Sequence, residues 1–317
     1  MYRGVALKIA STFAFAAMGA LAKAESGAFP IAQIIFFRSL FALVALILWL
    51  RWIGAFPRGI HTRRPFGHLL RGVVGTGGMG GFFLGLSLLP LPDATAIGYM
   101  TPLLVVVIAA LFLHEKVRAY RWSAVAAGFV GVIVMVSDHL GESSSSTLGV
   151  MAALFGASCA SLATIQTRRL TQSETTGAIV FYFSLLTTVL GFVLMTAGAF
   201  WPISAPLGAF FAQQFWVTPN FGQLATLCAI GMIGGAGQIL LTESYRYAEA
   251  SVIAPFDYVS MIWAVALGYL VFGDIPSLRI VAGASIVIAA GLYLIWREHR
   301  LGLSRPERPA SGVGRSA

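Results

Sequence analysis

Charged residues are scarce in this sequence of 317 residues: only 10% are Asp, Glu, Lys or Arg, whereas 58% are hydrophobic. A soluble domain carries about 25% charged residues, so this chain has too few to cover a surface that faces water. That scarcity excludes a soluble globular enzyme and a disordered protein. The two cysteines, Cys159 and Cys228, are too few for a disulfide scaffold and lack CxxC spacing, so we interpret both as small packing residues.

Motifs that carry chemistry are also missing. The sequence has no phosphate-binding P-loop, no HExxH, no GxSxG and no pair of carboxylates on one helix face. His114 stands beside Glu115 but has no second histidine at metal-ligand spacing. We therefore expect a protein that is not an enzyme and that holds neither a cofactor nor a metal.

Long apolar runs are what the sequence has instead. They are continuous rather than alternating, which favours membrane-spanning helices over a barrel, and each span needs about 20 apolar residues. Charged or Pro/Gly-rich breaks divide the chain into ten such runs, which predicts an all-α integral membrane protein. The predicted spans are 4–22, 31–50, 68–89, 94–113, 122–137, 148–166, 176–199, 222–245, 250–272 and 280–296.

The basic residues predict how these spans are oriented. Lys and Arg gather in cytoplasmic loops, so the net charge of +9 reflects topology rather than binding to nucleic acid. Of the 21 basic residues, only Lys23 and Arg279 fall in connections on the other side, and Arg38 falls inside a span. We therefore predict both termini in the cytoplasm of a bacterial inner membrane. The remaining 18 are Arg3, Lys8, Arg51, Arg58, Arg63, Arg64, Arg71, Lys116, Arg118, Arg121, Arg168, Arg169, Arg246, Arg297, Arg300, Arg305, Arg308 and Arg315.

The two halves of the chain resemble each other. Residues 36–40 match 181–185 at an offset of 145, and residues 77–80 match 234–237 at an offset of 157. Tyr99 then matches Tyr258 at an offset of 159. Five spans per half is an odd number, so the second half enters the membrane from the opposite face, as in many secondary transporters. The predicted units are a first repeat at 1–140, a second at 141–297 and a basic cytoplasmic tail at 298–317. The first span looks like a secretory signal, but the repeat requires that it stay.

These features resemble the drug/metabolite transporter superfamily, and within it the ten-helix EamA-type members. The resemblance covers about residues 3–297 and implies a transporter of small metabolites rather than one particular substrate. Two of the runs look most like the bacterial branch that takes up riboflavin or S-adenosylmethionine: RPFGHLLRG at 64–72 and APFDY at 254–258. The resemblance to the EamA-type members also rests on the stretch 94–115, which has Pro102 inside and Leu-His-Glu at its end, and on VFGD at 271–274.

Glycines and prolines mark where helices approach or break. Glycine at every fourth position lets helix backbones approach closely in lipid, and this spacing predicts either static packing or a sliding surface along the pathway. A proline removes one helical hydrogen bond, so Pro102 and Pro255 predict kinks in the fourth and ninth spans, near the binding region. The spaced glycines are Gly77, Gly81 and Gly85 in the third span and Gly231 and Gly235 in the eighth.

Charges inside spans are rare because each costs about 2.5–3.5 kcal/mol at the helix centre. Arg38 and Asp257 each lie seven residues into a span, so we expect both to face a cavity. Arg38 would hold an anionic or carbonyl group of the substrate. Asp257 would bind a proton, contact the substrate or pair with Arg38. Glu243 lies three residues before Arg246 near a helix end, which favours an interfacial ion pair over a coupling role.

Aromatic and amide residues on the central spans complete the candidate substrate site. Flat rings bind by stacking between such side chains, with a few hydrogen bonds to amides or hydroxyls. The set comprises Tyr99, Tyr258, Trp263, Phe82, Phe83 and Gln238. We also expect a short interfacial segment at 207–217, which carries four aromatic residues and no charge.

The sequence thus predicts a secondary transporter, a monomer or a homodimer, that moves a small metabolite by alternating access, with the proton as a candidate coupling ion. Uptake of riboflavin or a similar aromatic metabolite fits best. Uptake of S-adenosylmethionine, export of amino acids or drugs, and a non-transporting receptor or scaffold remain alternatives. A receptor would tolerate changes at Arg38 and Asp257, whereas a transporter would not.

Overall fold

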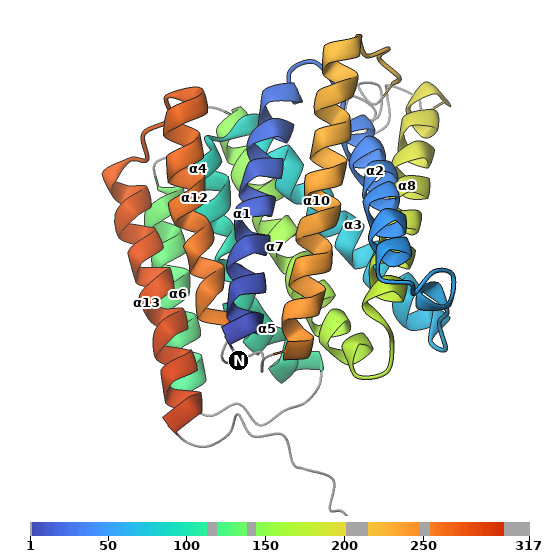
Figure 1. The fold of residues 1–317 in the computed structure, drawn as a ribbon. Coiled ribbons are helices and arrows are strands. Elements are labelled where there is room, and N and C mark those ends of the chain that lie inside the picture. The colour runs from blue at the N-terminus through green and yellow to red at the C-terminus, as the bar shows by residue number, and fades with distance from the viewer. Residues whose placement is uncertain (1, 113–118, 138–143, 201–214, 248–253, 301–317) are drawn as a thin grey trace, which may run out of the picture.

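A computed structural model describes residues 2–112, 119–137, 144–200, 215–247 and 254–300. Within these ranges the chain forms a bundle of helices and no strands, which confirms the predicted all-helical class (Figure 1). The first half contains α1 (Tyr2–Glu25), α2 (Ile31–Trp52), η1 (Arg58–Ile60), α3 (Pro65–Leu88), α4 (Leu91–Gly98), α5 (Met100–Phe112) and α6 (Ala119–Val136). The second half contains α7 (Ser144–Thr171), α8 (Thr176–Phe200), α10 (Phe221–Tyr247), η2 (Ala254–Tyr258), α12 (Val259–Leu267), η3 (Gly268–Phe272) and α13 (Leu278–Arg300).

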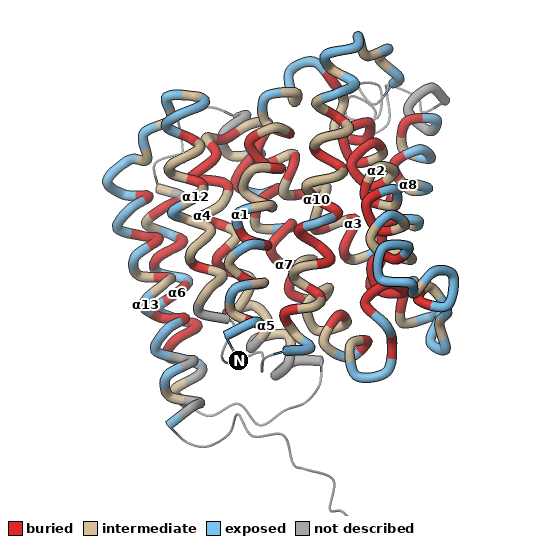
Figure 2. The backbone as a smooth tube through the Cα atoms, in the orientation of Figure 1, coloured by how far each residue is buried: buried red, intermediate tan, exposed pale blue. Residues whose placement is uncertain are grey.

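Six helices in the described ranges are long and apolar enough to cross a membrane: α1, α2, α3, α7, α8 and α10. Shorter apolar helices cover 122–135, 256–272 and 278–293. Large apolar side chains also face outward, among them Ile133, Phe192 and Leu270, and Figure 2 shows exposed residues along the outer helices α8 and α13. So much exposed apolar surface suits lipid rather than water, which supports a multi-pass membrane protein.

Glycines bring the central helices together. α3 packs along α7, and a Cβ atom at Gly81 would lie 2.6 Å from the Ala152 carbonyl oxygen and 2.7 Å from the Gly156 backbone. The spaced glycines of α3 all face α7, since Gly77 meets Cys159 and Gly85 meets Ala153. In the same way, Gly231 and Gly235 face the backbone of α2. Each of these glycines therefore lies in close contact with a facing helix, as the small-residue spacing predicts.

The helical geometry changes at matching positions. α4 ends at Gly98 and α5 begins at Met100, with Tyr99 as a turn between them, and the 3₁₀ turn η2 passes into α12 at Tyr258. Pro102 lies in the first turn of α5, where its missing N–H leaves the carbonyl of Gly98 without a helical partner. The break therefore falls three residues before Pro102 rather than as a kink within a continuous helix. Pro255 is the second residue of η2.

A buried glutamine ties a loop to the bundle. Gln33 on α2 donates from Nε2 to the Val217 carbonyl at 2.6 Å and accepts at Oε1 from the Val217 N–H at 2.9 Å. Trp216 packs against Phe36 and Phe37. These contacts fix the end of the segment expected at the interface, of which residues 207–214 lie outside the described residues.

Candidate functional site

The turn between α4 and α5 and the start of α12 contact each other through a pair of tyrosines. The rings of Tyr99 and Tyr258 lie 5.4 Å apart in an edge-to-face contact, and both side chains are buried. The Tyr99 hydroxyl shares a hydrogen bond of 3.1 Å with Ser260 Oγ, which in turn donates to the Asp257 carbonyl at 2.6 Å. The Tyr258 hydroxyl is buried without a hydrogen-bond partner among the described residues. At this tyrosine junction the Tyr258 hydroxyl packs directly against Gly291 on α13, where a glycine leaves room for it.

The other predicted aromatic residues lie elsewhere. Trp263 contacts Phe13 edge-to-face at 5.2 Å, and its indole Nε1 is buried without a partner in the described part of the chain. Phe82 and Phe83 contact each other within a separate hydrophobic cluster. Gln238 is buried on α10. The predicted set is therefore distributed over several places rather than gathered at one.

Asp257 pairs with Lys8, not with Arg38. Lys8 Nζ lies 2.5 Å from Asp257 Oδ1, and the two side chains are 3% and 39% exposed. Of the three roles considered for Asp257, pairing with Arg38 is not the contact seen in this structure. Lys8 was also expected to flank the first span, but it lies six residues into α1, about 9 Å from its start. A carboxylate in η2 thus neutralises a fully buried ammonium.

Arg38 lies beside a second buried arginine. The guanidinium carbon of Arg38 is 5.6 Å from the centre of the Phe183 ring, and that of Arg71 is 4.1 Å from it. Arg71 Nε donates to Thr167 Oγ1 at 2.8 Å. Arg71 was expected in a cytoplasmic connection, whereas it lies within α3 and is 5% exposed. We call these three residues, Arg38, Arg71 and Phe183, the arginine site.

The charges of the arginine site are not balanced by the residues around it. Arg38 Nε and Nη1 and Arg71 Nη1 are buried without a hydrogen-bond partner among the described residues. Each buried charge costs about 2.5–3.5 kcal/mol, and a desolvated cation–π contact contributes about 2 kcal/mol. One ring shared between two cations does not offset both charges. The site therefore has spare donors for a negative or acceptor-rich group.

Glu243 has the ion pair that the sequence predicts, with its Oε1 3.9 Å from Arg246 Nε. Arg246 Nη2 also donates to the Glu174 carbonyl at 2.7 Å, which joins the end of α10 to the turn between α7 and α8. These contacts favour a structural role for Glu243 at a helix end.

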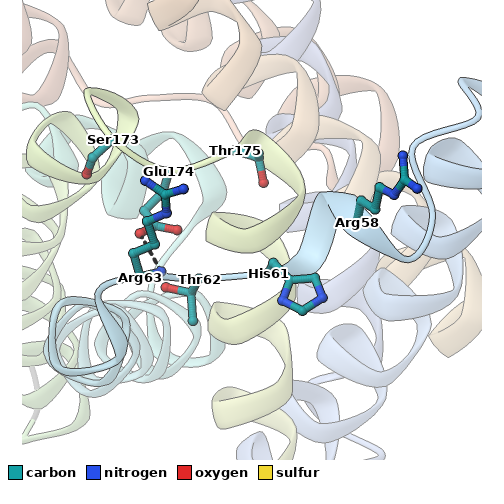
Figure 3. A pocket seen from close by; sticks show the side chains of 7 residues that line it. All are labelled: Arg58, His61, Thr62, Arg63, Ser173, Glu174 and Thr175. Carbon is teal, nitrogen blue, oxygen red and sulfur yellow. Dashed lines mark hydrogen bonds between the residues drawn. The ribbon is translucent and has the colours of Figure 1, made fainter.

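A surface cavity of about 480 Å³ lies beside Glu174, at the connection between η1 and α3 (Figure 3). The Glu174 carboxylate is buried: its Oε1 accepts from the Arg63 N–H at 3.0 Å, and its Oε2 lies 3.6 Å from His68 Nε2. In Figure 3 Arg63 lies beside Glu174, and Arg58 lies farther along the wall. The residues that line the cavity belong to η1 and to connections between helices, so the cavity lies among the loops rather than in the helical interior.

No cluster of three His, Cys, Asp or Glu residues that could hold a metal occurs in the described ranges. Sequence reasoning missed Lys8 and Arg71 because both lie within two turns of a predicted cytoplasmic end, where basic residues are common. Arg71 follows GHLL inside the apolar run of the third predicted span, and this position indicates an arginine within the span.

A many-helix membrane protein with buried, unbalanced charges in its interior has the features of a transporter. A profile of the EamA-like transporter family matches residues 2–137 and 147–297. The chain belongs to this family, which confirms the resemblance to drug/metabolite transporters. EamA transporters are not enzymes, and this membership implies a small-molecule substrate.

Curated relatives are transporters of different cargo. The chain is 26% identical over 275 residues to the S-adenosylmethionine uptake transporter of Rickettsia prowazekii, covering 87% of this chain and 86% of that protein. It is 28% identical to the pseudopaline exporter of Pseudomonas aeruginosa, covering 92% and 95%. It is 31% identical to the riboflavin transporter of Rhizobium johnstonii, covering 89% and 85%.

A solved crystal structure shares the fold, with a TM-score of 0.63, 18% identity and coverage of 94% of this chain and 98% of that chain. At this identity the likeness concerns the fold alone. Together with the bacterial relatives, it is consistent with a multi-pass protein of the inner membrane.

Proposed function

We propose that this chain is a ten-span secondary transporter that moves a small aromatic metabolite across the inner membrane by alternating access. The observation that carries this proposal is the tyrosine junction, where the turn at Tyr99 meets the change from a 3₁₀ turn to an α-helix at Tyr258. Irregular backbone at membrane depth is tolerated where it is buried in protein or lines a cavity. Interrupted helices at corresponding places in two halves point to a substrate region.

Helix packing supports an inverted repeat. If the first span corresponds to the sixth and the third to the eighth, then the pair α1–α10 corresponds to the pair α3–α7. Both pairs pack extensively, and they lie in the middle of the bundle in Figure 1. The family profile also matches in two segments that divide near residue 140. These features support repeats at 1–140 and 141–297, with 298–317 as a cytoplasmic tail.

Riboflavin is the first candidate cargo because buried aromatic side chains suit a flat ring and because a riboflavin transporter is among the relatives. S-adenosylmethionine also carries a ring and is the cargo named for other relatives. Export remains an alternative because of the pseudopaline exporter. The proton is the proposed coupling ion, with Asp257 as its proposed binding group.

A proteoliposome uptake screen tests the function. The panel contains flavins, S-adenosylmethionine, amino acids and nucleosides, each with and without a pH gradient. Uptake of one class that is lost in Tyr258→Leu and kept in Tyr269→Leu supports the proposal. Tyr269 is the matched control because it lies on η3 with its side chain 60% exposed. Absence of transport for the whole panel in both directions, or transport unchanged in Tyr258→Leu, contradicts it.

A further inference from the structure

The arginine site contains two cations and, among the described residues, no acid to neutralise them. The carboxylates that could do so are engaged elsewhere: Asp257 pairs with Lys8, Asp274 pairs with Lys23, and Glu174 contacts His68. Both guanidinium carbons lie within 6 Å of the Phe183 ring centre, so two like charges share one aromatic ring.

The surroundings hold both arginines in place. A Cβ atom at Gly75 would lie 2.6 Å from Phe183 Cε2, so the glycine leaves room for the ring beside α3. Arg71 Nε donates a hydrogen bond to Thr167, and Arg71 Nη1 has no partner among the described residues. Arg38 Nε lies 3.2 Å from the position of a Cβ atom at Gly234 on α10. Residues of four helices, α3, α7, α8 and α10, therefore surround donors that no described residue uses.

We infer that Arg38 and Arg71 form an anion-binding subsite for the cargo, which therefore carries a carboxylate or a phosphate group. Of the two cargoes named above, S-adenosylmethionine carries a carboxylate and riboflavin carries neither group, so this inference favours the former or a phosphorylated flavin. The planar guanidinium fork matches both groups through paired, charge-assisted hydrogen bonds. The Phe183 ring lies against both guanidinium groups and gives the subsite an apolar wall. This inference rests on the proposed function, since it names a chemical feature of the transported molecule.

Matched ligands test the inference on the purified wild-type protein. Riboflavin and flavin mononucleotide differ by a phosphate, and decarboxylated S-adenosylmethionine and S-adenosylmethionine differ by a carboxylate. Ligand-induced stabilisation in detergent should be greater for the member that carries the extra anionic group in at least one pair, with at least tenfold tighter binding, and the pair that responds identifies the anion. Equal binding of both members in each pair, or no stabilisation by either member that carries the group, overturns the inference.

Variants then assign the effect to the two arginines. Arg38→Gln and Arg71→Gln should each weaken binding of the ligand that carries the anionic group at least tenfold relative to binding of the member that lacks it. Arg71→Lys should keep part of the affinity. Arg51→Gln is the control because Arg51 lies on the same helix as Arg38 but is exposed. Anion binding that is unchanged in both glutamine variants overturns the inference.

Transport separates this inference from the proposed function. If proteoliposomes take up the members with and without the anionic group equally, the inference fails and the transporter remains. If binding discriminates as expected but no ligand of the panel is transported in either direction, the subsite stands and the proposed function fails.

Discussion

Lys8 shows how a single buried charge is accommodated near the N-terminal end of α1. Its ammonium contacts Asp257 and lies 5.7 Å from the centre of the Tyr245 ring. A basic residue so close to a helix end could extend to the interface, but here it turns into the bundle. Its partner explains why a carboxylate is retained in η2 and makes Asp257 part of a pair rather than an isolated acid.

Replacing Asp257 by Asn should therefore destabilise the protein. The change leaves the Lys8 ammonium buried and unpaired, which costs about 3 kcal/mol, the low end for a broken buried pair, because Asp257 is partly exposed. The measurement is the thermal unfolding midpoint in detergent, with the protein level in membranes beside it. A second change, Lys8→Met, should restore most of the lost stability by removing the unpaired charge.

Glu243→Gln is the matched control for this prediction. Its partner Arg246 is 38% exposed, so the pair should contribute less than about 1 kcal/mol. If Asp257→Asn has the same unfolding midpoint as the parent, the ion pair does not stabilise the fold. If stability holds and transport loses its dependence on pH, Asp257 acts as the proton-binding group.

At the scale of helices, α3 and α7 are held by backbone contact at glycines. Gly81→Ala places a methyl group where the Ala152 carbonyl oxygen lies 2.6 Å away, so the two helices must separate. We expect a loss of about 1–3 kcal/mol, measured as a lower unfolding midpoint. Gly80→Ala is the control, because its nearest contact is Ile35 Cδ1 at 3.8 Å, and alanine favours the helix by about 1 kcal/mol. Equal midpoints for the two variants would contradict the packing role.

A second element-level prediction concerns the segment before α10. Gln33→Leu removes both hydrogen bonds to Val217 and leaves its backbone polar groups without their partners. The local cost should be about 1–3 kcal/mol, seen as faster hydrogen exchange at the Val217 amide. Gln223→Leu removes an exposed hydrogen bond to Asn220 and should leave exchange at Val217 unchanged. The prediction fails if Gln33→Leu leaves that exchange rate as in the parent.

The sequence predicts the elements better than it predicts their contacts. Apolar runs and proline positions give the helices and the neighbourhood of both breaks, because these depend on local hydropathy and on a missing N–H group. Which charges pair depends on how helices distant in sequence lie together. Asp257 could therefore be identified as a buried carboxylate, but its partner Lys8 could not. Arg71 was missed because a basic residue near a helix end is ordinary.

At the scale of the whole molecule, charge sidedness supports the proposed orientation. Lys8 and Arg71 lie inside helices, so they do not count as loop charges, but Arg58, Arg63 and Arg64 are exposed on the connection before α3. Lys23, predicted on the opposite face, pairs with Asp274 at 3.2 Å and also donates to the Leu89 carbonyl. Lys23 lies in the last turn of α1, where these contacts hold it, so it is not a free loop charge on that face.

Cysteine labelling tests this orientation across the whole chain. In a background with Cys159→Ala and Cys228→Ala, a cysteine at Ser144, the first residue of α7, should react with an impermeant maleimide from the periplasm. A cysteine at Ser311, outside the described residues, should react only after the inner membrane is made permeable. An even number of spans up to the tail and an odd number up to Ser144 place these residues on opposite sides. Labelling of both from one side, or the reverse pattern, would contradict ten spans with cytoplasmic termini and, with them, the inverted repeat on which alternating access depends.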